Sequence, residues 1–154
     1  MKISVASVLS LAVLVPTATA DFEVYWTAAA GNAGLVRDWA PYAKEPTCDE
    51  ALDAERWGNR GDVSGNKFGI RCKGTCGADG SIDEMEMNFN ENAHWTFYKH
   101  RSNSLVDKNG KEIGKCYTKT DEGKYFCNYG PSVIYGGFKR LYCQTSKTIE
   151  DIRA

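Results

Sequence analysis

The stretch from residue 83 to residue 100, DEMEMNFNENAHWTFYKH, decides the fold that this sequence encodes. Apolar side chains occupy every second position on both sides of Asn90-Glu91-Asn92, and such alternation is typical of strands with one buried face. The apolar residues at these positions are Met85, Met87, Phe89, Trp95 and Phe97. The stretch therefore predicts a β-hairpin, and matching its two apolar faces places Phe89 opposite Trp95.

The same register predicts what meets on the opposite, polar face of the hairpin. It places Glu86 opposite Tyr98 and Glu84 opposite His100. A carboxylate beside an imidazole is a usable general base and acid couple, so these four residues are the candidate catalytic group. The alternative interpretation is a solvated sheet face with a cross-strand salt bridge. The only other histidine, His94, stands six residues from His100, roughly 20 Å along a straight strand.

This arrangement of tyrosine, histidine and glutamate resembles part of the active site of small fungal ribonucleases, in which these residue types stand on neighbouring strands of one sheet. The resemblance implies RNA hydrolysis by Glu84 or Glu86 with Tyr98 and His100. The family's second catalytic histidine has no counterpart in this sequence. Its phosphate-binding arginine is not identified either, since Arg101 is expected on the other face of the hairpin.

The rest of the chain predicts more strands and one short helix. Phe22, Val24 and Trp26 share a face of a strand at residues 21–26, and residues 28–34 and the prolines Pro41 and Pro46 are expected in loops. Tight turns are expected at Asn109-Gly110, Asp121-Glu122-Gly123 and Gly130-Pro131. We expect a mainly β or α+β domain. It would be a single antiparallel meander of about seven to nine strands, as one sheet or a sandwich.

The helix is predicted to begin at Thr47. Thr47-Cys48-Asp49-Glu50 has the form of a capping box, in which the threonine oxygen and the glutamate carboxylate each accept from the other's backbone amide. Gly58 is expected to end the helix after about ten residues. Cys48 in its first turn is expected to tie it to the sheet.

Residues 1–20 predict a cleavable export signal. Lys2 is followed by an apolar run from Ile3 to Val15, and Ala18-Thr19-Ala20 supplies the small residues before a cleavage site. The apolar run is too short to span a membrane. We therefore expect one secreted domain, residues 21–154, with a frayed polar tail at residues 146–154, acting outside the producing cell or after uptake into another cell.

Six cysteines follow the signal, and an even number in an exported chain predicts disulfides. The predicted disulfide cysteines are Cys48, Cys72, Cys76, Cys116, Cys127 and Cys143. Fifteen pairings remain open. Cys72 and Cys76 have no second close pair to complete a zinc site, and three residues separate them, which is not redox-motif spacing. No metal and no cofactor are expected.

The charge of the chain bears on its partners. Without Lys2 there are 18 basic and 20 acidic residues, a net charge of −2. This balance makes nucleic acid an unfavourable partner and gives no reason to expect attraction to anionic lipid. Tyr129, Tyr135 and Tyr142 lie near glycine-rich turns and are candidates for binding a protein or a sugar. We assume a monomer.

The layout of signal, aromatic start at Phe22-Glu23-Val24-Tyr25-Trp26 and dispersed cysteines resembles the small secreted cysteine-containing proteins of filamentous fungi. Many of these are effectors that act on a plant host. The resemblance implies a secreted protein that binds a host protein or a wall component through a β-sheet surface. A ribonuclease-like hydrolase and a wall-associated, polysaccharide-binding protein are the alternatives.

Overall fold

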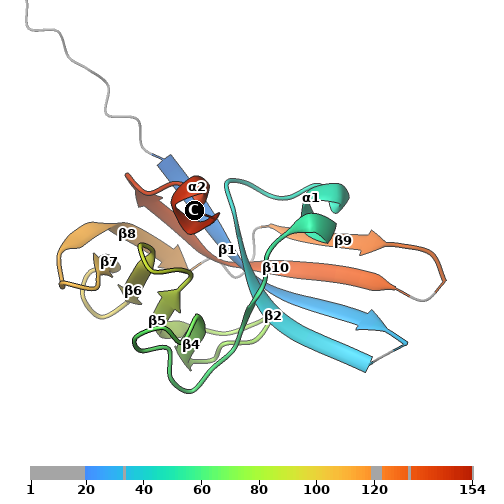
Figure 1. Cartoon of the computed structure of the whole chain (residues 1–154), viewed down its shortest axis with the longest axis horizontal. Coiled ribbons are helices and arrows are strands. Elements are labelled where there is room, and N and C mark those ends of the chain that lie inside the picture. Colours follow the sequence, from blue (N-terminus) through green and yellow to red (C-terminus); the bar gives the residue numbers. More distant parts are fainter. Residues whose placement is uncertain (1–19, 33, 119–122, 132, 154) are drawn as a thin grey trace, which may run out of the picture.

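The computed structural model describes residues 20–32, 34–118, 123–131 and 133–153. The predicted export signal lies outside the described residues, except for Ala20. The described residues form ten strands and two short helices (Figure 1). Their bounds are β1 Ala20–Gly31, β2 Gly34–Tyr42, α1 Cys48–Asp53, β3 Trp57–Gly58, β4 Gly69–Gly74, β5 Ile82–Asn88, β6 His94–Tyr98, β7 Ser104–Asp107, β8 Glu112–Thr118, β9 Lys124–Asn128, β10 Ile134–Thr145 and α2 Ile149–Arg153.

The strands make one antiparallel sheet that curls until its two ends nearly meet. The order across it is β3-β2-β1-β10-β8-β7-β6-β5-β4, with β9 also paired to β10. Between the end strands β3 and β4, the amide of Arg60 donates to the carbonyl of Ile70 at 2.8 Å, beside an isolated bridge from Asn59 to Ile70. The predicted fold class, a mainly β meander with a short helix in its first half, is confirmed.

The longest pairing joins the first strand to the last. β1 pairs with β10 over almost the whole length of both strands. On its other edge, β10 pairs with β8 along its second half and with β9 along its first half. β8 and β9 therefore lie end to end along β10, and the hairpin predicted between them around residues 121–123 is wrong. Residues 119–122 themselves lie outside the described part of the chain.

The main hydrophobic core fills the inside of the curled sheet. Phe22 and Val24 of β1 are fully buried there, as the alternation predicted. α2 packs at one end of this core, where Ile149 and Ile152 are buried. The side-chain amide of Asn90 donates there to the backbone carbonyls of Asp151 and Ile152. The predicted frayed tail is therefore wrong over 149–153. Its two isoleucines, three residues apart, form one face of a helical turn.

A second, smaller core lies on the outer face of β1, β2, β9 and β10, under α1. Tyr25, Tyr42 and Tyr125 are buried there against Ala51 of the helix. The capping box is confirmed, with the Glu50 amide donating to Thr47 Oγ1 at 3.3 Å and the Thr47 amide to Glu50 Oε2 at 2.7 Å. The helix has six residues, fewer than predicted, because its backbone becomes extended at Ala54. No helix in the described residues is long and apolar enough to cross a membrane.

Two predicted loops near the start of the chain are partly strands, although Pro46 lies in a loop as predicted. β1 continues through Ala28-Ala29-Ala30 to Gly31, and β2 begins at Gly34 and includes Pro41, which lies opposite Val24. Alanine and glycine have little intrinsic preference for strands. Their extension here follows from pairing on both sides, with β10 on one edge of β1 and β2 on the other.

All six cysteines are paired, as the sequence predicted. Cys48–Cys127 joins α1 to β9, Cys116–Cys143 joins β8 to β10, and Cys72–Cys76 closes a short loop after β4. The first bridge links residues 79 positions apart and the second 27, whereas Cys72 and Cys76 are separated by four. The longer loops restrict the unfolded chain most.

We predict that the disulfides differ in their contribution to stability. Replacing Cys48 and Cys127 by serine should lower the free energy of unfolding by about 4 kcal/mol, and replacing Cys72 and Cys76 by about 2 kcal/mol, because loop-closure entropy grows with loop length. Urea unfolding of the two double variants measures the difference. An equal or larger loss in the variant without the Cys72–Cys76 bridge would contradict this account.

Candidate functional site

The hairpin of β5 and β6 forms as predicted, but its register differs by two residues. Glu84 lies opposite Tyr98, and Glu86 lies opposite Thr96. The predicted pairs of Glu84 with His100 and Glu86 with Tyr98 are therefore wrong. The turn is tighter than matching apolar faces implied, because the amide of Phe89 donates to the carbonyl of Ala93 at 2.9 Å. A shift of two residues leaves every side chain on its predicted face.

His100 does not belong to the strand. It follows β6 in an exposed turn, where its ring meets the edge of the Tyr98 ring at a centroid distance of 5.7 Å. The Arg101 guanidinium lies over the Tyr98 ring at 4.1 Å, which corrects the expectation that Arg101 points to the other face. Ser102 and Asn103 adopt positive φ angles of 53° and 61°, so the chain turns sharply here. Of the two histidines, His94 is the one beside a glutamate.

A network of charged side chains occupies the outer face of β4, β5 and β6. Arg71 Nη2 lies 3.0 Å from Glu84 Oε1 and 2.7 Å from Glu86 Oε2, and its Nε donates to Glu86 Oε2 at 2.9 Å. His94 Nε2 lies 2.9 Å from Glu86 Oε1, and Lys73 Nζ lies 2.9 Å from Glu84 Oε1. We call these five residues the Arg71 network. Sequence reasoning missed Arg71 because β4 pairs with β5 across a long, irregular connection.

The network shifts the pKa of two of its members, Glu86 and Arg71. Although partial burial raises the pKa of Glu86, hydrogen bonds from Arg71 and His94 outweigh it and hold that pKa below its ordinary value. The hydrogen bond to Glu86 raises the pKa of Arg71. Glu86 is therefore a carboxylate near neutral pH. Both of its oxygens are already engaged by its neighbours.

The geometry of the network bears on the ribonuclease resemblance. It places histidine, glutamate and arginine on the three neighbouring strands β6, β5 and β4. In-line phosphoryl transfer requires the attacking and leaving oxygens on opposite sides of phosphorus, so its base and its acid must also stand apart. Glu86 and His94 instead form a direct hydrogen bond with each other. Among the described residues, the only other histidine is His100, in the exposed turn.

A polar hollow of about 650 Å³ adjoins His94. Two of its asparagines already form hydrogen bonds within the protein. The side-chain amide of Asn88 donates to the carbonyls of Val63 and Gly65, and that of Asn90 donates to α2. The lining residues are Gly65, Asn66, Asn88, Asn90, Glu91, Asn92, His94 and Lys108. Its lining side chains are polar or charged, so the hollow offers hydrogen bonds to a small polar molecule.

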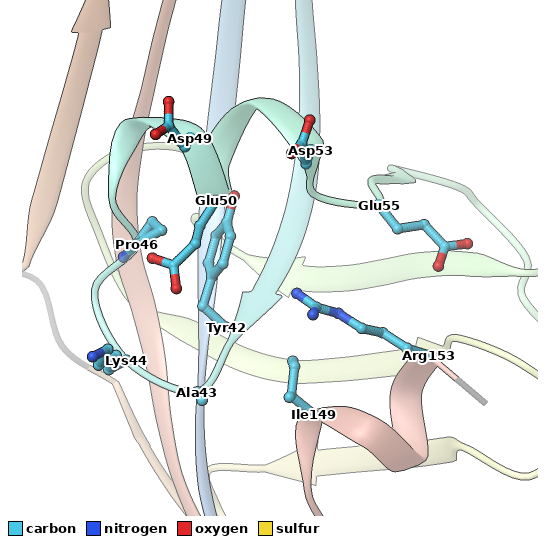
Figure 2. Close-up of a pocket in the computed structure, with 10 residues that line it drawn as sticks. All are labelled: Tyr42, Ala43, Lys44, Pro46, Asp49, Glu50, Asp53, Glu55, Ile149 and Arg153. Atoms are coloured by element: carbon cyan, nitrogen blue, oxygen red, sulfur yellow. The ribbon is translucent and has the colours of Figure 1, made fainter.

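A second hollow, of about 610 Å³, lies between α1 and α2 (Figure 2). It contains four acidic residues, but they do not converge. Figure 2 shows Asp49 and Asp53 pointing away from Arg153, and the Glu55 carboxylate lying on the other side of Arg153 from its guanidinium. Glu50 is engaged by Thr47 in the capping box. Within the described residues, no group of three or more histidine, cysteine, aspartate or glutamate side chains could hold a metal ion.

The three candidate tyrosines do not form one surface. Tyr129 and Tyr135 pack edge to face at 5.5 Å, and the Arg56 guanidinium covers the Tyr135 ring at 4.4 Å. Tyr142 lies seven residues further along β10, and its hydroxyl donates to Asp21. Stacking of a sugar needs a free aromatic face, and Tyr135 has one face covered by Arg56.

A further exposed surface is apolar, and sequence reasoning missed it. It is the face of β1, β2, β9 and β10 opposite α1, where these strands run beyond the curled body (Figure 1). Phe126 is 72% exposed, Leu35 51%, and Ile134 and Phe138 40% each. We call this surface the open face. Its eleven residues are Trp26, Ala28, Ala30, Leu35, Arg37, Lys124, Phe126, Asn128, Ile134, Gly136 and Phe138.

The alternation along β9 shows why Phe126 is exposed. Tyr125 and Cys127 point toward α1 and are buried, so Lys124, Phe126 and Asn128 point the other way. The sequence contains this alternation. Which side α1 would cover could be known only from the fold.

Comparisons of the chain with protein-family models, with curated proteins and with solved structures found no match. Its function is therefore inferred from the surfaces described above.

The Arg71 network predicts a pH dependence of stability. Because the pKa of Glu86 is lower in the folded protein than its ordinary value of 4.5, its contribution to stability is present above that pH and is lost as the pH falls through the folded value. Glu86→Gln should therefore weaken the loss of stability in acid. The midpoint of urea unfolding, measured against pH, tests this. The exposed Glu91→Gln is the control and should follow the wild type; identical profiles for all three proteins would contradict the prediction.

Proposed function

We propose that this protein is an exported, effector-like binding protein that contacts a host or cell-wall component through the open face. The observation that carries the proposal is the exposure of Phe126, Phe138, Ile134 and Leu35 on one continuous sheet surface. Monomeric proteins rarely expose large contiguous apolar patches unless these bind something. The three disulfides are consistent with an oxidising environment outside the cell.

The two faces of the same strands differ, which supports a binding role. The face under α1 is filled by Tyr25, Tyr42 and Tyr125 and linked by Cys48–Cys127. The chain thus has a helix, a disulfide and a set of tyrosines to bury one face of the sheet. On the other face Phe126, Leu35, Ile134 and Phe138 remain exposed, whereas the face under α1 leaves Val36 exposed near its end. We attribute this difference to use of the open face by a partner.

We predict that a photo-reactive side chain at position 126 will cross-link to the partner. The protein with a benzoylphenylalanine in place of Phe126 should form adducts when irradiated with plant extracellular fluid, cell-wall material or plant membranes. The matched control carries the same group at Phe68, which is 40% exposed and lies outside the open face. Adducts at neither position, or equally at both, would contradict the proposal. Retention on chitin or glucan, lost in Phe126→Ser, would identify the partner as polysaccharide.

The second candidate function is RNA hydrolysis, favoured by the contact of Glu86 with His94 and Arg71. We predict that the wild-type protein does not cleave RNA, because one directly bonded pair cannot supply both an acid and a base in line. Incubation with RNA tests this, with His94→Ala and His100→Ala as matched variants. Cleavage that is lost in the first variant and kept in the second would overturn our proposal in favour of the hydrolase.

A further inference from the structure

Two stretches of the chain that lie side by side in the fold contain no charged residues. Residues 24–36 and 125–138 contain no Asp, Glu, Lys or Arg, although charged residues make up 25% of the chain. The pairing of β1 with β2 and with β10, and of β10 with β9, places both stretches side by side. The described parts of both stretches lie mainly in β1, β2, β9 and β10, where these strands project beyond the curled body (Figure 1).

The charges that border these two stretches have one sign on the open face. Lys124 is on β9 and Arg37 is on β2, at the two outer strands, and no acidic residue is among the eleven positions. Lys139, which also borders the uncharged stretch, is on the covered face and is paired with Glu23 at 2.8 Å. The two inner strands contribute only apolar residues or glycine to the open face.

We infer that the open face binds the surface of a lipid bilayer that contains anionic lipid. The inference rests on the proposed function and names its partner. Aromatic and aliphatic side chains enter the headgroup boundary of a membrane, while flanking Lys and Arg side chains reach the lipid phosphates. Phe126, Phe138 and Ile134 would supply the first contribution, and Lys124 and Arg37 the second.

The composition of the surface favours lipid over a protein partner. Protein interfaces surround their apolar centre with a polar rim that makes many hydrogen bonds. The open face has only three polar side chains, Arg37, Lys124 and Asn128. A net charge of −2 would oppose binding to anionic lipid if the charges were spread evenly over the surface. On the open face, however, the charged residues are Arg37 and Lys124, which are both positive.

Trp26 provides a reporter for this surface. It lies on the open face and is only partly buried, next to Phe138 at a ring distance of 6.3 Å. The other three tryptophans, Trp39, Trp57 and Trp95, are buried in the core. Quenching of tryptophan fluorescence by bromine atoms on lipid acyl chains would therefore report insertion of this face.

The experiment measures binding of the disulfide-bonded protein to vesicles of phosphatidylcholine with phosphatidylserine, by flotation and by bromolipid quenching. We expect wild-type protein to float with the vesicles and to be quenched. Phe126→Ser should reduce the partition coefficient about tenfold, because the variant loses the burial of one phenylalanine side chain in the bilayer. Phe68→Ser is the matched control and should bind like the wild type. Both side chains are exposed, so neither variant should perturb folding.

The charges are tested separately. The double variant Arg37→Gln, Lys124→Gln should lose the preference for vesicles with phosphatidylserine over pure phosphatidylcholine, and added salt should have the same effect on the wild type. No flotation of the wild type, or equal flotation of Phe126→Ser and Phe68→Ser, would overturn the lipid inference. If position 126 still cross-linked selectively to a protein or polysaccharide, the proposed function would stand while this choice of partner would fall.

Discussion

The antiparallel pairing of β1 with β10 is the constraint on which the rest of the structure depends. It joins the first and last strands of the chain, so the sheet becomes nearly closed and its inner face can bury one core. The same two strands are longer than their neighbours and continue past the curled body, where β2 and β9 flank them. One long pairing therefore creates both the closed core and the extension that carries the open face.

The pairing contains an irregularity that links these two parts. The register shifts between Val24 and Tyr25, so that Arg140 of β10 has no partner across the strand. Arg140 is 1% exposed, and it donates to the carbonyls of Ala78 and Gly80 at 2.7 and 2.6 Å. Burial lowers its pKa, which is the cost of placing this guanidinium inside the protein. The bulge thereby holds the loop that follows β4 against the sheet, where the body ends and the extension begins.

The Arg71 network and the open face differ in whether their side chains have interaction partners within the protein. In the Arg71 network every carboxylate has a cation within hydrogen-bond distance, so the network stabilises the outer face of β4, β5 and β6 without needing a ligand. The open face has no comparable internal partner for Phe126 or Leu35. Apolar surface left in water is what favours association. For this reason we propose that binding occurs at the open face and not at the β5–β6 hairpin.

The local pattern of this sequence determined the β5–β6 hairpin, the capping box and the pairing of the cysteines, because alternation and capping act over a few residues and the cysteine number is even. Glu84, Glu86, Tyr98 and His94 could be placed on one polar face for the same reason. Their contacts could not, because a register can shift by two residues without exposing any apolar side chain. Arg71 and the exposure of Phe126 depended on pairings between distant segments. Only the tertiary structure decided which apolar face α1 would cover and which would remain open, since burial is set by what packs against a strand and not by the strand's own residues.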